Sequence, residues 1–327
     1  MKAITVTAAG GVEVLNFGDK PEPQVKTGDV KIKVKAFGIN RAESYYRAGT
    51  YGTLLPGRVP GIEAVGEVVA DPSGTFKLGQ KVVTVMGGMM FARDGSYAEY
   101  TTVELKQVLA IDSDIDFIKL AALPELYLTI WGALDQNRQI KAGETLLVRG
   151  ATSALGLAAV TYAKARDLTV IATTRNEERR QRLIELGADH VVIDTGEIAD
   201  EVRKIVPAGV DKVLEIVGGP TVKDSLKTVS PWGEVVFVGL LGGAPVIEQF
   251  NLMGDLPNTV KLSFFSSGML GSEQLPLSDS PLNWIADQVY QGLMPDITAE
   301  VFKAEDIQKA HTKMDNDEAF GKLVVHF

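Results

Sequence analysis

The chain contains 327 residues, of which 45% are apolar, and it carries a formal net charge of −9 at pH 7. Domains usually contain about 100 to 200 residues, so this length predicts two domains with substantial cores. The acidic balance argues against a nucleic-acid surface, which needs clustered Lys and Arg. No stretch has the roughly 18 apolar residues of a membrane span, and the first residues lack the pattern of a signal peptide, so we expect a cytoplasmic protein with neither nucleic-acid nor membrane partners.

Cysteine is absent, and the only histidines are at positions 190, 311 and 326. Thiolate zinc sites, iron–sulfur clusters, disulfides and a cysteine nucleophile are therefore excluded together. No histidine has a second one three to five residues away, the spacing of a metal-binding pair. We expect no metal site and interpret the histidines as surface or packing residues.

The first 120 residues show short apolar runs separated by Gly and Pro. Runs such as VKIKVKAFGI and IEAVGEVVA alternate apolar with polar residues, which is typical of half-buried antiparallel strands. The last residues contain a helical pattern, NWIADQVYQGL, and a strand-like run, LVVHF. Because such a tail rarely folds alone, we expect it to join the β-rich lobe, giving a first domain of residues 1–120 and 266–327.

After Leu120 the pattern becomes an alternation of apolar strands and helical stretches. Examples in chain order are TLLVRG, ALGLAAVTYAKARD, TVIATT, EERRQRLIELG and HVVID. Apolar strands separated by helices of about ten residues indicate a parallel sheet with crossover helices. Residues 121–265 are therefore predicted to form a doubly wound, dinucleotide-binding α/β domain.

The first strand of this domain leads into a glycine-containing turn and then into the helix LAAVTYAKA. Strand, turn and helix in this order are the context of a dinucleotide pyrophosphate site. Compared with the pattern G-x-G-x-x-G, the chain has Ala151, Ser153 and Gly156. The residues expected to hold the pyrophosphate are Ala151, Thr152, Ser153, Ala154, Leu155 and Gly156. A tight turn with a purely structural role would explain the same residues.

The end of the next strand, IATTRNEERR, bears on the choice of cofactor. NAD sites place Asp or Glu about twenty residues after the glycine turn, whereas NADP sites omit the acid and add Arg. Here the chain has Thr174, Arg175 and, one helical turn later, Arg179. We expect these three residues to bind the 2′-phosphate of NADPH. The alternative is that both arginines are solvated charges at the start of a helix.

Across essentially its whole length the chain resembles the zinc-free quinone oxidoreductase branch of the medium-chain dehydrogenase/reductase superfamily. The residues that carry the resemblance are Gly38-Ile39-Asn40, Tyr45, Arg47, Pro60 to Val68, Leu78 to Val82, Thr129, Trp131-Gly132-Ala133, Gly150 to Gly156, Leu186 to His190 and Gly321 to Val324. The resemblance implies a GroES-like β-rich catalytic domain joined to a Rossmann domain.

The departures from the superfamily are informative. Zinc-dependent members have Gly-His-Glu where this chain has Gly61-Ile62-Glu63, and a cysteine where it has Asn40. Because Ile cannot ligate a metal, the resemblance implies zinc-independent chemistry, with Glu63 in a structural role.

The implied activity is hydride transfer from NADPH to a small-molecule quinone or activated alkene, such as an enone or enal. By resemblance, Thr129 and Lys322 contact the cofactor, as does Gly239 after the strand GEVVFVG. Asn40 and Tyr45 line the nicotinamide side, and Tyr51 stands where related enoyl-thioester reductases have a tyrosine acid. Each tyrosine has the alternative role of a packing residue whose hydroxyl lies at the surface.

Two other functions remain open at this point. One is an enoyl-thioester reductase, although no concentrated Lys/Arg patch for an acyl carrier is visible in the first lobe. The other is a catalytically idle NADPH-binding sensor or scaffold protein. Whichever function applies, the apolar run VKLSFF is a candidate edge strand through which the nucleotide-binding sheets of two copies could pair. A homodimer is therefore expected.

Overall fold

The computed structural model describes residues 1–137 and 139–327. The chain divides into two compact units, Met1–Leu128 with Ser267–Phe327 (unit 1) and Thr129–Ser266 (unit 2). The sequence placed the two boundaries after residues 120 and 265. The first boundary falls inside helix α3 (Pro124–Trp131), which continues into a π-helical turn at Gly132–Gln136.

Unit 1 is mainly β-structure. Its strands are β1 (Lys2–Val6), β2 (Leu15–Asp19), β3 (Asp29–Gly38), β4 (Glu63–Ala70), β5 (Lys81–Val85), β6 (Tyr100–Glu104), β7 (Val108–Ala110), β14 (Thr298–Lys303) and β15 (Lys322–His326). Its helices are α1 (Arg41–Arg47), α2 (Phe117–Leu120), α9 (Leu282–Tyr290) and α10 (Ile307–Asp315). The larger sheet has the order β14-β15-β3-β4-β5-β7, with β6 paired to β3, and β1 pairs with β2.

The long strand β3 organises unit 1 because three strands pair with it, all antiparallel. Its apolar residues alternate with charged ones, and Val30, Ile32 and Val34 are buried. The tail strand β15 pairs with the end of β3, with Val324 opposite Gly38. This register brings the start of β15 to the point where the chain leaves β3 for α1.

Unit 2 is a single parallel sheet with helices. Its strands are β8 (Thr145–Arg149), β9 (Thr169–Thr174), β10 (His190–Ile193), β11 (Val210–Glu215), β12 (Val229–Phe237) and β13 (Lys261–Phe264). Its helices are α4 (Ala154–Ala165), α5 (Arg180–Glu185), α6 (Ala199–Ile205), α7 (Val222–Thr228) and α8 (Leu252–Asp255). The strand order is β10-β9-β8-β11-β12-β13, which is the doubly wound order of dinucleotide-binding domains.

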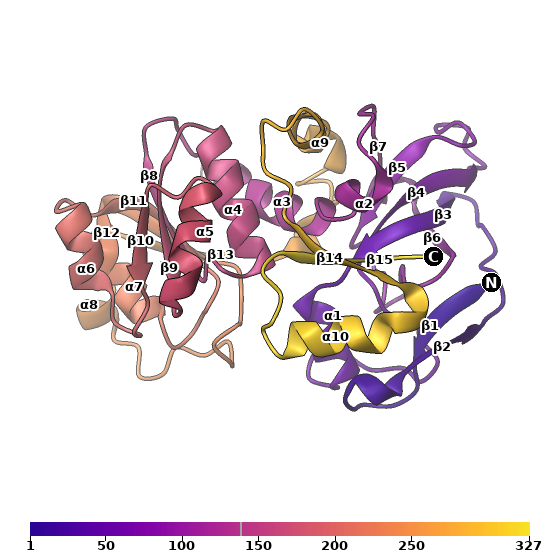
Figure 1. Ribbon diagram of the computed structural model, residues 1–327, viewed down its shortest axis with the longest axis horizontal. Helices are drawn as coiled ribbons and strands as arrows, with labels where there is room; N and C mark the ends of the chain where they lie inside the picture. The colour runs from indigo at the N-terminus through magenta and orange to yellow at the C-terminus, as the bar shows by residue number, and fades with distance from the viewer. Residues whose placement is uncertain (138) are drawn as a thin grey trace. The chain divides into compact units, whose positions relative to one another are not determined.

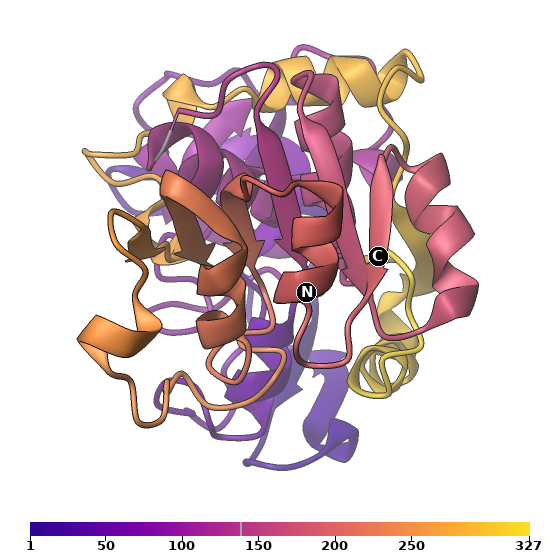
Figure 2. The ribbon, with the colours of Figure 1, turned by 90° about the vertical axis from the view of Figure 1, so that its left-hand side faces the viewer.

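Both faces of the unit 2 sheet are covered. Helices α4 and α5 lie on one face, and α6 and α7 lie on the other (Figure 1). The turned view shows the strands of this unit running alongside one another (Figure 2). Since neither face meets water, the strands are almost continuously apolar, and Leu147, Ile171 and Val213 are fully buried. Among the described residues, no helix combines the length and the apolar character needed to cross a membrane.

Candidate active site

The turn between β8 and α4 has the geometry of a pyrophosphate-binding loop. Gly150 adopts a φ of +89°, a conformation that L-residues with a side chain rarely take. Ser153 is the N-cap of α4: its hydroxyl donates to the carbonyl oxygen of Gly150 at 2.8 Å and accepts from the N–H of Gly156 at 3.0 Å. The hydroxyl thus fastens the turn to the first turn of the helix; Thr152, Ser153, Ala154 and Leu155 are half-exposed, whereas Ala151 and Gly156 are buried.

Gly156 allows the helix to approach the strand. A Cβ atom at this position would lie 2.4 Å from the carbonyl oxygen of Gly150 and 2.5 Å from the Cα of Ala151. Such distances are far below van der Waals contact, so no larger residue fits without moving the turn. Close helix–strand packing and an N-terminus facing a small-residue loop are what a bound dinucleotide requires, and the residues present fit that group.

The end of β9 forms the second part of this edge. Thr174 is buried, and its hydroxyl accepts from the N–H of Asn176 at 3.1 Å and donates to the carbonyl of the same residue at 3.0 Å. Arg175 is exposed, and Arg179 is half-buried in the 3-10 turn Glu177–Arg179. The hydroxyl of Thr173 accepts from the N–H of Gly150 at 3.1 Å, so the end of β9 lies beside the turn between β8 and α4.

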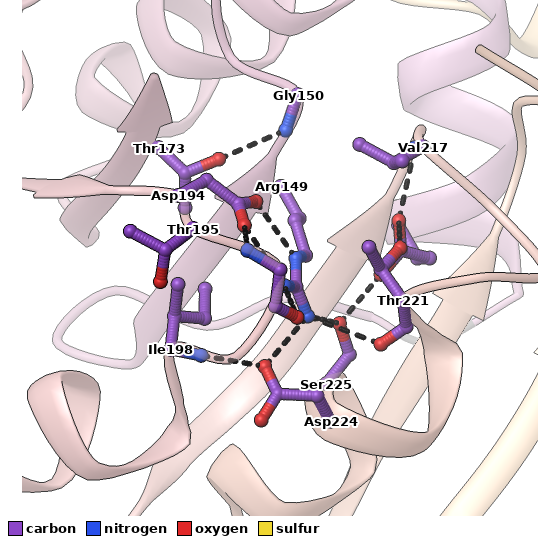
Figure 3. Close-up of polar contacts among 12 residues, drawn as sticks. Arg149, Gly150, Thr173, Asp194, Thr195, Ile198, Val217, Thr221, Asp224 and Ser225 are labelled. Atoms are coloured by element: carbon purple, nitrogen blue, oxygen red, sulfur yellow. Dashed lines mark hydrogen bonds and ion pairs between the residues drawn. The ribbon is translucent and has the colours of Figure 1, made fainter. Parts of the chain in front are cut away.

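A buried arginine network lies at the same edge of the sheet (Figure 3). Arg149 ends β8, and its side chain is fully buried. Its Nε and Nη2 donate to the two carboxylate oxygens of Asp194 at 2.9 and 3.0 Å. Its other bonds go to Gly196 O (2.8 Å), Thr221 O (3.0 Å), Asp224 Oδ2 (2.9 Å) and Ser225 Oγ (3.0 Å). One guanidinium therefore joins the end of β8, the loop after β10 and helix α7.

Glu215, the last residue of β11, completes this network. It accepts from the N–H groups of Val217 and Gly218 at 2.9 and 3.0 Å and from the hydroxyls of Thr221 and Ser225 at 3.0 and 2.5 Å. Burial raises the pKa of this carboxyl, although those hydrogen bonds and the charge of Arg149 oppose the rise.

The sequence analysis missed this network. A signal was present, because TLLVR and VDKVLE are apolar strands that end on a charged residue, and HVVI is followed by Asp194. The carboxyl ends of parallel strands meet at one edge of a sheet, so such residues come together there.

Unit 1 contains a second buried polar cluster, built around Lys322. Its ammonium lies 2.6 Å from Glu63 Oε1, and both side chains are only 1% exposed. It also donates to Asn40 Oδ1 at 2.5 Å, while the amide nitrogen of Asn40 donates to Glu63 Oε1 at 2.9 Å. Gly38 leaves room for this arrangement, since a Cβ there would lie 2.1 Å from Lys322 Cε.

Two more carboxyl groups belong to this cluster. Glu43 accepts from the N–H groups of Asn40 and Ile62 at 2.6 and 3.1 Å, and Glu63 accepts from the N–H of Glu125 at 2.8 Å. Burial raises the pKa of Glu43 to about 7 and that of Glu125 to about 8, and the charge of Glu63 adds to both shifts. With a single ammonium among three carboxyl groups, the cluster retains protons near neutral pH.

The sequence analysis named Asn40, Glu63 and Lys322 but missed Glu43 and Glu125. The spacing of Asn40 and Glu43 is that of a capping box at the start of α1, which was a usable signal. The structure brings Asn40 and Lys322 into contact and commits the Lys322 ammonium to Glu63. A role of Lys322 toward the cofactor stays a prediction.

The two predicted tyrosines lie on α1 and in the loop after it. Tyr45 is half-buried, and burial raises the pKa of its hydroxyl, with the charge of Arg41 opposing the rise. Tyr51 is 46% exposed and packs edge-to-face against Phe91, with the ring centroids 5.3 Å apart. No residue within 1–137 or 139–327 makes a hydrogen bond to the Tyr51 hydroxyl. Phe91 also packs against an apolar cluster that contains Tyr46, Ile62, Met86 and Met90.

Thr129 and Gly239 belong to unit 2. Thr129 lies on α3 and is 6% exposed. Gly239 follows β12, and a Cβ at this position would lie 2.4 Å from the carbonyl oxygen of Ile216. Gly239 is thus close to the loop after β11, the strand that lies next to β8 in the sheet. Over the described part of the chain, no group of three or more His, Asp or Glu side chains is arranged to hold a metal ion.

Comparisons with known proteins agree with this geometry. Residues 26–113 match the family described as alcohol dehydrogenase GroES-like domain, and residues 154–277 match the family described as zinc-binding dehydrogenase. The chain is 34% identical to human quinone oxidoreductase over 275 residues, which are 82% of this chain and 81% of the human protein.

Solved structures are similar over the whole chain. The quinone oxidoreductase of Pseudomonas syringae pv. Tomato DC3000 has a TM-score of 0.87 and 26% identity, covering 100% of this chain and 99% of that protein. A mycobacterial protein solved in complex with NADPH has a TM-score of 0.86 and 25% identity, covering 100% of both chains.

Proposed function

The chain belongs to the quinone oxidoreductase branch of the medium-chain dehydrogenase/reductase superfamily, and from that membership we propose that it transfers a hydride from NADPH to a quinone or an activated alkene without a metal ion. The family matches confirm the predicted fold class, a GroES-like domain with a Rossmann-type domain. We assign the catalytic domain to unit 1 and the nucleotide-binding domain to unit 2.

The observation that carries the proposal is the turn from Gly150 to Gly156. Apart from Ser153 and Gly156, whose N–H groups bond within the turn, residues 151–156 present N–H groups at the start of α4, where the helix dipole favours a pyrophosphate. The clash that a Cβ at Gly156 would make with Gly150 O shows how closely this turn is packed. Thr129 and Gly239 are proposed to contact the cofactor as well, together with Lys322. When bound, NADPH supplies the hydride.

The residues Thr174, Arg175 and Arg179 form the proposed phosphate subsite. Thr174 stands where an NAD enzyme carries a carboxylate, so no acid at this position repels a 2′-phosphate. Each charge-assisted hydrogen bond from an arginine contributes about 1.5 to 3 kcal/mol when shielded from water, and less where the side chain is exposed. Arg179→Ala is expected to weaken the binding of NADPH and to leave that of NADH unchanged. Thr174→Asp is expected to reduce the preference for NADPH over NADH. Equal effects on both cofactors would contradict the assignment.

On the acceptor side, Asn40 and Tyr45 are proposed to line the nicotinamide end, with Tyr51 as proton donor. Reduction of a quinone takes up one hydride and one proton and yields the hydroquinone, whose oxygens can be protonated by water. An activated alkene takes the hydride at its β-carbon and needs a proton at its α-carbon. Tyr51, which is 46% exposed, is proposed to supply the proton at the α-carbon.

Independence from zinc is supported by the buried ion pair of unit 1. Ile62 offers no ligand atom, and the ammonium of Lys322 already balances Glu63 at 2.6 Å. A carboxylate paired in this way has its charge compensated without a metal ion. The resident cation of this cluster is therefore a side chain.

The decisive experiment measures NADPH oxidation with a benzoquinone, an enal, an enone and an enoyl-CoA, with and without a chelator, alongside metal analysis. We expect turnover with the quinone or the enone, unchanged by the chelator. Reduction of the enoyl-CoA alone would indicate an enoyl-thioester reductase instead. NADPH binding without turnover on any acceptor would indicate a sensor or scaffold, and a zinc ion whose removal abolishes turnover would refute the metal-free assignment.

We further propose a homodimer in the cytoplasm, formed through β13. This strand ends the unit 2 sheet, and its Phe264 is 65% exposed. An uncovered apolar edge strand invites pairing with a second copy. Sedimentation velocity is expected to show a dimer that Phe264→Asp weakens, and a wild-type monomer at all concentrations would overturn this assignment.

A further inference from the structure

The loop that follows β10 places a carboxylate next to the proposed phosphate subsite. The N–H of Asp194 donates to the carbonyl oxygen of Thr174 at 2.8 Å, so Asp194 lies next to the end of β9, one residue beyond Ile193, the register partner of Thr174. Asp194 lies directly after β10, and its side chain is 8% exposed. A fixed negative charge at this position matters to a cofactor whose 2′-phosphate carries nearly two negative charges.

Arg149 holds the carboxylate of Asp194 in place. Its two bonds to Asp194 are the parallel pair of a bidentate contact, which fixes the carboxylate's orientation as well as its position (Figure 3). The N–H of Gly196 also donates to Asp194 Oδ1, at 2.9 Å. These three bonds fix the position of the Asp194 carboxylate.

The charge of Arg149 is shared among several acids. The guanidinium also binds Asp224 at 2.9 Å, and Glu215 lies in the same network through Ser225. One fully buried guanidinium therefore binds two carboxylates directly. Because its single positive charge is shared between them, part of the negative charge of Asp194 is not compensated by Arg149.

The remaining charge of Asp194 reaches Arg175. Burial works to raise the pKa of the Asp194 carboxyl, but the hydrogen bonds and charge of Arg149, the N–H of Gly196 and the charge of Arg175 together hold it below its usual range. Arg175 is exposed and comes directly after Thr174, the residue whose carbonyl oxygen accepts from the N–H of Asp194. The charge of Asp194 thus opposes the attraction of Arg175 for an anionic ligand.

We propose that Asp194 is a specificity-determining residue for the cofactor: held by Arg149 next to the strand end that carries Thr174 and Arg175, its carboxylate lowers the affinity for the 2′-phosphate and so limits the preference for NADPH over NADH. The inference rests on the proposed phosphate subsite. NADH has a hydroxyl in place of the phosphate, so its affinity is insensitive to this charge. A merely structural role for Asp194 would change the affinities for both cofactors together.

The test compares dissociation constants for NADPH and NADH, measured by the fluorescence of the reduced nicotinamide on the full-length protein. Asp194→Asn is expected to tighten NADPH about three- to tenfold, with NADH changed less than about twofold, since one unit charge is removed across a partly screened distance. Asp189→Asn is the matched control. Asp189 flanks the other end of β10, where it binds Lys164 at 2.7 Å and the N–H of Val170 at 2.8 Å. The control variant therefore removes one negative charge at the opposite edge of the sheet.

An unchanged NADPH-to-NADH ratio in a folded Asp194→Asn protein, or a change that Asp189→Asn reproduces, would overturn the inference. If Asp194→Asn does not fold, the two dissociation constants are measured on Thr195→Lys instead, because Thr195 is exposed and makes no bond to Arg149. The added cation is expected to tighten NADPH selectively, and no change in the ratio would again overturn the inference. A wild-type protein that binds neither cofactor would refute the proposed function itself.

Discussion

His311, on α10, is expected to make unit 1 sensitive to acid. The imidazole is completely buried. Its Nδ1 lies 3.2 Å from Arg47 Nη1, and its Nε2 lies 3.1 Å from the Tyr97 hydroxyl. Because a guanidinium can only donate, Nδ1 must accept, and the ring proton is on Nε2 facing Tyr97. A proton on Nδ1 would point at the N–H of Arg47 and would replace this hydrogen bond with a repulsive contact. Burial, and after it the charge of Arg47, lower the pKa of His311 to about 3.

The sign and size of the effect follow from proton linkage. An unfolded histidine takes up a proton at its ordinary pKa of 6.5, whereas the folded ring stays neutral down to about 3. Between these pH values the unfolded state binds one more proton than the folded state. The contribution of His311 to the free energy of unfolding is therefore fully present above pH 6.5 and decreases as the pH falls. At about 1.36 kcal/mol per pH unit, the loss reaches about 2 kcal/mol at pH 5 and about 5 kcal/mol near pH 3.

The assay is urea unfolding of the wild type and His311→Gln at about pH 7.5 and about pH 5. Glutamine can accept from Arg47 and donate to Tyr97 but does not titrate. We expect the wild type to lose about 2 kcal/mol more than His311→Gln between the two pH values. His190→Gln, at an exposed position, is the matched control and should retain the wild-type loss. Equal losses in the wild type and His311→Gln would refute the buried neutral ring.

Three further outcomes are expected. Gly38→Ala should lower the free energy of unfolding by about 3 kcal/mol, because its Cβ would displace Lys322 from the buried ion pair, whereas Gly18→Ala, with nothing within 4 Å, should change it little; equal urea midpoints would contradict this. Gly156→Ala should raise the dissociation constant of NADPH at least about tenfold in a fluorescence titration, since its Cβ would lie 2.4 Å from a carbonyl oxygen, and unaltered binding would argue against the turn as cofactor site. Tyr51→Phe should slow enone reduction by about 10²-fold or more while sparing the quinone, and equal rates for the variant and wild type would make Tyr51 a packing residue.

The local patterns of the sequence were enough to predict the fold class and the family. Alternation in VKIKVKAFGI, the succession of apolar strands and helices after Leu120, and the Gly150 to Gly156 turn are each confined to a few neighbouring residues. Hydrophobic periodicity, turn-forming residues and the order of strands and helices are properties of neighbouring residues, so they can be recognised in the sequence alone. The residues of the cofactor turn could be named on the same basis, although their role toward NADPH stays a prediction.

The sequence offered signals for single members of the two buried charge clusters, but it could not predict which charged residues pair with one another. Lys322 and Asn40 are 282 positions apart, and they meet because β15 pairs with β3 in one register. A slip of one residue would send Lys322 to the opposite face of the sheet and leave Glu63 without its cation. Arg149 likewise binds Asp194 and Asp224, 45 and 75 positions away, only because the strand order brings their loops to one edge. A charged residue shows no periodicity of its own, so its burial and its partner are decided by strand pairing, which only the tertiary structure determines.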